Sequence, residues 1–131
     1  MRVAAPVIGT VLILVACSRS GGPEMQRGEV LFVQHCAVCH GRDARGDGSL
    51  AGRLPVPPAD LTGLAARNGG VFPWSDTMAK IHGYEGRAGV MPEFGTMLRG
   101  PTVIWRDGSG TPVKTPVGLL ALARYLASIQ M

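Results

Sequence analysis

Two cysteines and a histidine, Cys36, Cys39 and His40, form a C-x-x-C-H motif that constrains this 131-residue chain more than any other feature. The two thiols lie one helical turn apart, so each can add to one vinyl group of a haem. The histidine that follows can then bring its imidazole under the iron as the proximal ligand. The spacing therefore predicts a fold built around one covalently attached haem, haem c.

Three other kinds of site could use the same residues. A structural zinc ion takes four ligands, normally from two separated pairs, and the sequence has no second Cys/His pair. A thioredoxin-like dithiol is typical of a strand–helix context, whereas Cys36 follows an amphipathic stretch and precedes a glycine-rich segment. A disulfide between Cys36 and Cys39 stays open as an alternative, although it gives His40 no role.

The first residues of the chain predict export. Arg2 precedes an apolar run over residues 3–16, which is too short for a membrane span of about 20 residues and typical of a signal peptide. The run ends in the sequence LVAC, which resembles the lipobox of bacterial lipoproteins and ends at Cys17. We therefore expect a signal peptide over residues 1–16 and a lipidated tether over residues 17–24, with Cys17 as the lipidated residue. An ordinary signal sequence with an incidental cysteine is the alternative.

The rest of the chain, residues 25–131, is sized for a single domain, because its length suits one core and it has no internal repeat. The charge is mildly basic, with 13 Lys and Arg against 9 Asp and Glu. No basic run is interleaved with aromatic residues, so nucleic acid binding is not predicted. We expect a monomer.

Hydrophobic periodicity and helix breakers predict an all-α fold with about four helices and long loops. Small and apolar residues at i, i+3, i+4 and i+7 predict an amphipathic helix from Met25 to Val38, with Pro23 and Glu24 in its first turn. Glycines and prolines are dense over residues 41–60, which predicts a long loop. Packing around a flat cofactor would give such a loop a function.

Three later helices are expected from their caps and stops. Asp60 or Thr62 could cap a short helix that ends at Arg67, and Ser75 could cap another that ends at His82. Thr115 is the expected N-cap of an apolar closing helix. Between them, the sequence over residues 102–105 favours a short extended segment followed by a turn, and the role of the segment 99–115 is unassigned.

Methionine sulfur is a second iron ligand in many haem proteins, and three methionines are candidates. Met78 lies on an expected helix and Met97 has no rigid neighbour, whereas Met91 is followed by Pro92, which restricts its backbone to extended conformations. Together with the C-x-x-C-H motif, the Met91-Pro92 pair resembles class I c-type cytochromes. The resemblance, which covers most of residues 25–130, implies that Met91 binds the iron opposite His40.

The resemblance implies further structural roles. Gly28, in the first helix, is expected to pack on Tyr125 in the last helix. The second ring nitrogen of the proximal histidine is expected to bond the carbonyl of a loop proline, which is Pro55, Pro57 or Pro58. Side chains that could hold the haem propionates are Arg67, Trp74, Tyr84 and Arg87, and His82 is an alternative to Met91 as iron ligand.

The function that the resemblance implies is one-electron transfer without catalysis. The expected protein is tethered by lipid on the periplasmic side of a bacterial membrane and carries electrons between a redox donor and a redox acceptor. One alternative is a haem c subunit of a larger oxidase or dehydrogenase complex. Another is an open-site haem enzyme or gas-binding protein, which requires that Met91 does not bind the iron.

Overall fold

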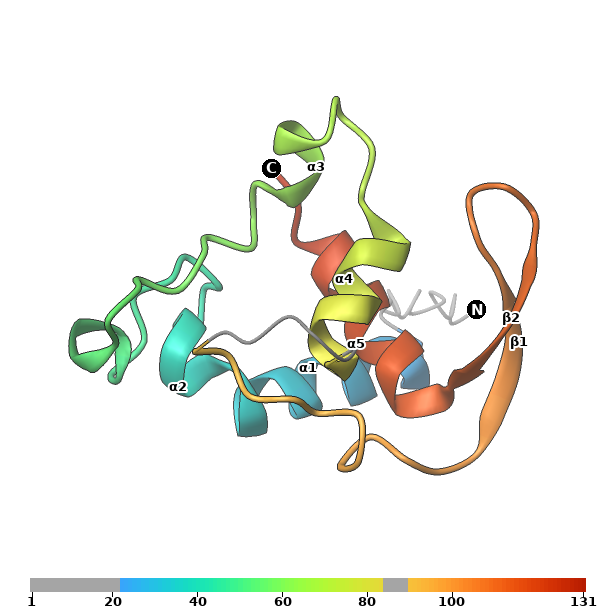
Figure 1. Cartoon of the computed structure of the whole chain (residues 1–131), viewed down its shortest axis with the longest axis horizontal. Helices are drawn as coiled ribbons and strands as arrows, with labels where there is room; N and C mark the ends of the chain where they lie inside the picture. The colour runs from blue at the N-terminus through green and yellow to red at the C-terminus, as the bar shows by residue number, and fades with distance from the viewer. Residues whose placement is uncertain (1–21, 84–89) are drawn as a thin grey trace, which may run out of the picture.

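The computed structural model describes residues 22–83 and 90–131 (Figure 1). These residues form five α-helices, one short 3₁₀ helix and one two-stranded sheet. The elements in chain order are α1 Pro23–His35, α2 Ala37–His40, η1 Ala51–Arg53, α3 Leu64–Arg67, α4 Trp74–His82, β1 Thr102–Arg106, β2 Pro112–Pro116 and α5 Val117–Ser128. The expected signal peptide, Cys17, Tyr84 and Arg87 lie outside the described residues.

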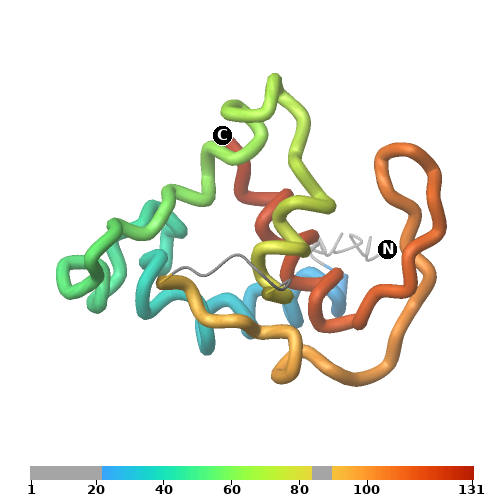
Figure 2. Tube along the Cα trace, in the orientation of Figure 1, coloured from blue at the N-terminus to red at the C-terminus, as the bar shows by residue number. Residues whose placement is uncertain are grey.

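Helices α1 and α5 cross at close range, and small residues permit the approach (Figure 1, Figure 2). A Cβ added at Gly28 would lie 2.2 Å from the carbonyl oxygen of Ala121 and 2.8 Å from the Cβ of Tyr125. One turn further along α1, the rings of Phe32 and Tyr125 pack with their centroids 5.3 Å apart. The predicted packing of Gly28 on Tyr125 is confirmed. Pro23 occupies the first turn of α1 with Glu24, as expected.

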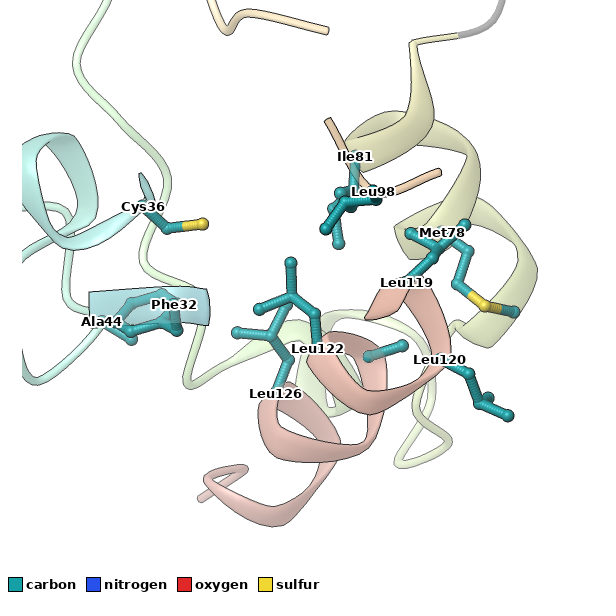
Figure 3. Close-up of a cluster of buried hydrophobic side chains, with 11 residues drawn as sticks. Phe32, Cys36, Ala44, Met78, Ile81, Leu98, Leu119, Leu120, Leu122 and Leu126 are labelled. Atoms are coloured by element: carbon teal, nitrogen blue, oxygen red, sulfur yellow. The ribbon is translucent and has the colours of Figure 1, made fainter. Parts of the chain in front are cut away.

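The core lies around α5, whose apolar side chains meet those of α1, α4 and residue 98 (Figure 3). Phe32 is fully buried, and Met78 and Ile81 are buried on α4. Cys36 belongs to the same buried cluster, and in Figure 3 its sulfur points toward the side on which Ile81 and Leu122 lie. The C-x-x-C-H motif is therefore continuous with the hydrophobic core.

A β-hairpin corrects the expectation of an all-α fold. Strands β1 and β2 pair antiparallel, with Val103 opposite Thr115 and Trp105 opposite Val113. The expected extended segment and turn are present, but the turn leads back into a second strand. β-Branched and aromatic residues favour this pairing. The Asp107 carboxylate closes the turn by accepting hydrogen bonds from the backbone N–H groups of residues 109 and 111, each at 2.9 Å.

The hairpin and the loop over residues 41–60 lie at opposite ends of the molecule's longest axis (Figure 1, Figure 2). The Trp105 ring packs on Trp74 at the start of α4, with centroids 6.1 Å apart. This contact attaches the hairpin to the helical body. The segment 99–115, whose role the sequence leaves open, is mostly this projecting hairpin.

The three expected helix caps are wrong. Helix α3 follows Gly63, α4 follows Pro73 and α5 follows Pro116, and none of the three has a side-chain cap. Thr115 is instead part of β2, where it is buried and donates its hydroxyl to the Val113 carbonyl. Asp60 accepts hydrogen bonds from Thr62 in a local turn before α3. The expected ends of α3 at Arg67 and of α4 at His82 are confirmed.

Candidate haem-binding site

The C-x-x-C-H motif lies at a break between two helices. The expected continuous helix to Val38 ends instead at His35, and Cys36 separates α1 from α2. The amide groups of Cys39 and His40 donate to the Cys36 carbonyl at 3.1 and 2.9 Å. This short turn keeps the two thiols close in space and redirects the chain. The side chain of His40 points inward as a result and is only 8% exposed.

The orientation of His40 is set by a backbone carbonyl. Its Nδ1 lies 2.9 Å from the carbonyl oxygen of Ala59. A carbonyl can only accept, so Nδ1 carries the proton and Nε2 keeps the lone pair that an iron ligand needs. The carbonyl belongs to Ala59 and not to Pro55, Pro57 or Pro58, so the expectation of a proline carbonyl is wrong. The residue that makes the contact directly follows Pro58, the nearest of the three candidates.

The loop after the motif is tied back onto α2. The amides of Gly46 and Gly48 donate to the carbonyls of His40 and Cys39 at 2.8 and 3.0 Å. A Cβ added at Gly48 would lie 2.4 Å from the Val38 carbonyl oxygen, so the loop passes α2 at a distance that only glycine permits. The glycines of this loop therefore hold it against the motif.

An open, mostly apolar cavity of about 710 Å³ borders the motif. Its walls include Cys36, Cys39 and His40 together with apolar residues from the loop 50–58 and the segment 90–94, namely Leu50, Leu54, Val56, Pro57, Val90 and Phe94. A second cavity of about 300 Å³ lies toward Ile81 and Leu122 and shares Cys36, His40, Lys80 and Met91 with the first. These volumes fall in the range of about 300–1,000 Å³ that is typical of ligand sites. The apolar walls, two thiols and an imidazole fit a covalently attached haem.

The structure brings Met91 to these cavities. Met91 is half-buried and lines both, and among the described methionines it alone does so. Its segment is attached to the end of α4, because the amides of Phe94 and Gly95 donate to the Ile81 and His82 carbonyls, each at 3.0 Å.

The other candidate iron ligands lie elsewhere. Met78 is buried in the core, and Met97 is 53% exposed. Met78 and His82 line a groove between α4 and the hairpin.

The Cys36 thiol has the properties of a protected rather than a reactive cysteine. Burial, reinforced by the neighbouring Cys39, raises the pKa of Cys36 to about 11. A redox-active dithiol needs a lowered thiol pKa, so this environment disfavours the thioredoxin-like interpretation. Both cysteines are free, and over residues 22–83 and 90–131 no three His, Cys, Asp or Glu side chains cluster to hold a metal ion.

One cationic residue at the cavities was not anticipated from the sequence. Lys80 lines both of them from α4, on the same helix face as Thr77 and Ile81. This i, i+3 and i+4 spacing predicts the shared helix face, but it does not predict that the face borders the cavities. Of the residues expected at the propionates, Arg67 donates to the Asp60 carbonyl and Trp74 packs on Phe72 and Trp105; neither lines either of these two cavities.

Comparison with known proteins adds one match. Residues 23–105 match the family model described as cytochrome c oxidase, cbb3-type, subunit III. The matched span contains the C-x-x-C-H motif, Ala59, Lys80 and Met91, and it ends within β1. No curated protein matches the chain. Among the helices that the structure describes, none has the length and apolar character needed to cross a membrane.

Proposed function

Because the chain belongs to the cytochrome family described as cytochrome c oxidase, cbb3-type, subunit III, we propose that it transfers single electrons at one haem c held between His40 and Met91. Membership of this family implies covalently bound haem c. The bound iron supplies the one-electron chemistry. The observation that carries the proposal is that Cys36, Cys39, His40 and Met91 line one apolar cavity.

Each residue has a separate task in this proposal. Cys36 and Cys39 form the two thioether links, and His40 offers Nε2 to the iron because the Ala59 carbonyl accepts the proton of Nδ1. Met91 supplies a thioether sulfur, a ligand that favours the reduced iron and so raises the potential. With haem bound, His40 and Met91 would both hold the iron and would stay its ligands in both oxidation states, which would suit electron transfer rather than catalysis.

Replacing the proposed sulfur ligand tests this assignment. Met91→Ala should abolish the far-red sulfur-to-iron absorption band of the oxidised protein and produce a high-spin or water-ligated spectrum. Met97→Ala is the matched control, because Met97 is an exposed methionine of the same segment. Survival of the band in Met91→Ala would move the ligand to another methionine.

The proposed location is the periplasmic side of a bacterial membrane, with Cys17 as the lipid anchor. The support is the apolar run and LVAC sequence at the start of the chain, together with the export that attachment of haem c requires. Cys17→Ser should move the haem protein from the membrane fraction to the soluble fraction. Retention at the membrane in that variant would contradict lipid anchoring.

A second candidate function is a fixed haem subunit of a terminal oxidase. The matched family is described as an oxidase subunit, which favours an oxidase over a dehydrogenase as the larger complex. Purification in mild detergent separates the two functions. A subunit should copurify with oxidase haem and activity at constant ratio, whereas a mobile carrier should separate from them on the first column.

A further inference from the structure

We propose that Lys80 is the cation that pairs with a haem propionate and raises the reduction potential, an inference that rests on the proposed haem site. Lys80 lines both cavities together with Cys36, His40 and Met91, the residues to which the haem is assigned. Lys80 thereby acts as a positioning and potential-setting residue rather than as an iron ligand.

The cavities contain few charges to meet the two carboxylates that a haem carries. Apart from the motif residues, their ionisable side chains are His35, Asp76 and Lys80. Asp76 would repel a carboxylate, and among the Lys and Arg residues of the described chain only Lys80 lines either cavity. A carboxylate next to an apolar wall is unfavourable unless a charge or donor meets it, so Lys80 is the residue suited to this role.

The position of Lys80 on α4 suits a pair at the cavity mouth. Its neighbours on the helix face, Thr77 and Ile81, are buried, whereas Lys80 itself is exposed. A lysine in this setting lays its methylene stem along the apolar wall and extends its ammonium group to solvent. The propionates are the polar edge of an otherwise apolar cofactor, and they would meet the ammonium group at this boundary.

The other described cations with recorded partners are engaged away from the cavities. Four arginines have hydrogen-bond or ion-pair partners elsewhere: Arg45, Arg67, Arg106 and Arg124. Arg67 was expected at the propionates from the sequence. In the structure, its guanidinium donates to the carbonyl of Asp60, in the turn before α3. Lys80 therefore replaces Arg67 in that role.

The sign of the effect follows from the charge change at the iron. Oxidation adds one positive charge to the haem, and a nearby cation disfavours that state, so Lys80 raises the reduction potential. Lys80→Gln should lower the equilibrium constant for reduction by roughly tenfold, for charges about 10 Å apart in an effective dielectric of about 20. A tenfold change in a one-electron couple corresponds to about 59 mV.

Spectroelectrochemical titration of the holoprotein tests the proposal. Lys80→Gln should lower the potential, Lys80→Arg should keep it near the wild-type value, and Lys114→Gln, which removes an exposed lysine from the hairpin, should leave it unchanged. The propionate bending modes in the resonance Raman spectrum should shift in Lys80→Gln alone. An unchanged potential in Lys80→Gln with full haem content would overturn the proposal.

Two further measurements distinguish an effect of the Lys80 charge on the potential from a loss of folding or of haem attachment. If Lys80→Gln lowers haem content, restoration of both content and potential by Lys80→Arg supports the role of charge, and failure of Lys80→Arg to restore them contradicts it. A wild-type protein that carries no covalent haem would instead contradict the proposed function itself. Denaturing gels stained for haem distinguish these two failures.

Discussion

The two sides of this molecule are held together in different ways. On one side, α1 and α5 cross in direct contact, with Gly28 against the Ala121 backbone and the Phe32 ring against Tyr125. On the other side, the loop 41–60 and the segment 90–94 border open apolar volume and are held by backbone and side-chain hydrogen bonds, such as that between His40 and Ala59. The first side is a packed interface between two helices. The second side is an apolar surface that we expect a bound cofactor to cover.

This difference indicates that side-chain packing stabilises one side of the molecule and haem stabilises the other. Close packing of apolar side chains stabilises a fold without help. Apolar walls that face a cavity gain that stabilisation only when an apolar group covers them. We therefore expect the helix crossing to depend on side-chain fit and the cavity side to depend on haem attachment.

The largest effect should come from preventing that attachment. The double variant Cys36→Ser with Cys39→Ser cannot form thioether links, so amide protection in the loop 41–60 and the segment 90–94 should be lost almost completely in hydrogen exchange. Amides of α1 and α5 should lose less. Cys17→Ser is the control, because it removes a cysteine but leaves both links. Equal loss of protection on both sides would refute the comparison.

The next largest effect should come from the packed side. Phe32 is 0% exposed and contacts Tyr125. Phe32→Ala should lower the free energy of unfolding of the holoprotein by about 3–5 kcal/mol, because a large buried ring leaves a cavity behind. Val30→Ala on the same helix, at a side chain that is 52% exposed, should change it by less than about 0.5 kcal/mol. Denaturant unfolding followed by circular dichroism measures both.

The packed side was also the more predictable from the sequence. The start of α1 depends on local residues, Pro23 and Glu24, and the contact of Gly28 with Tyr125 follows from the resemblance to class I cytochromes. Both are confirmed. The hairpin was foreseen only as an extended segment and a turn, because its second strand contains two prolines and a lysine and lacks the usual alternation.

The loop-built side resisted prediction for a physical reason. Which carbonyl meets His40 depends on the path of a long loop. The resemblance to class I cytochromes therefore pointed to a loop proline, whereas Ala59 makes the contact. Lys80 was missed because its proposed role comes from tertiary placement: it lines the same cavities as Met91, a residue on a separate segment. Short-range sequence patterns predict helices and turns well, but they carry little information on which distant segments line the same cavity.

A smaller change at the crossing should sharpen the contrast with the loops. Gly28→Ala introduces a Cβ into contact with the Ala121 carbonyl and should destabilise the holoprotein by about 1–3 kcal/mol, because the helices must move apart. Gly52 is the matched control, since its added Cβ meets nothing within 4 Å. Gly52→Ala should be within about 0.5 kcal/mol of wild type. Equal effects at both positions would mean that the crossing is not tightly packed.

The smallest effect should come from the charged rim of the same crossing, where Glu24 in the first turn of α1 pairs with Arg124 of α5. The two side chains are 55% and 41% exposed, so water screens their attraction and they remain hydrated when separated. Glu24→Gln should therefore lower the free energy of unfolding by less than about 1 kcal/mol, with Glu29→Gln on α1 as the control carboxylate. The difference should vanish at about 1 M salt, where the screening length is about 3 Å. A larger loss that persists in salt would assign part of the crossing's stability to charge, whereas the expected result leaves it with Gly28 and Phe32.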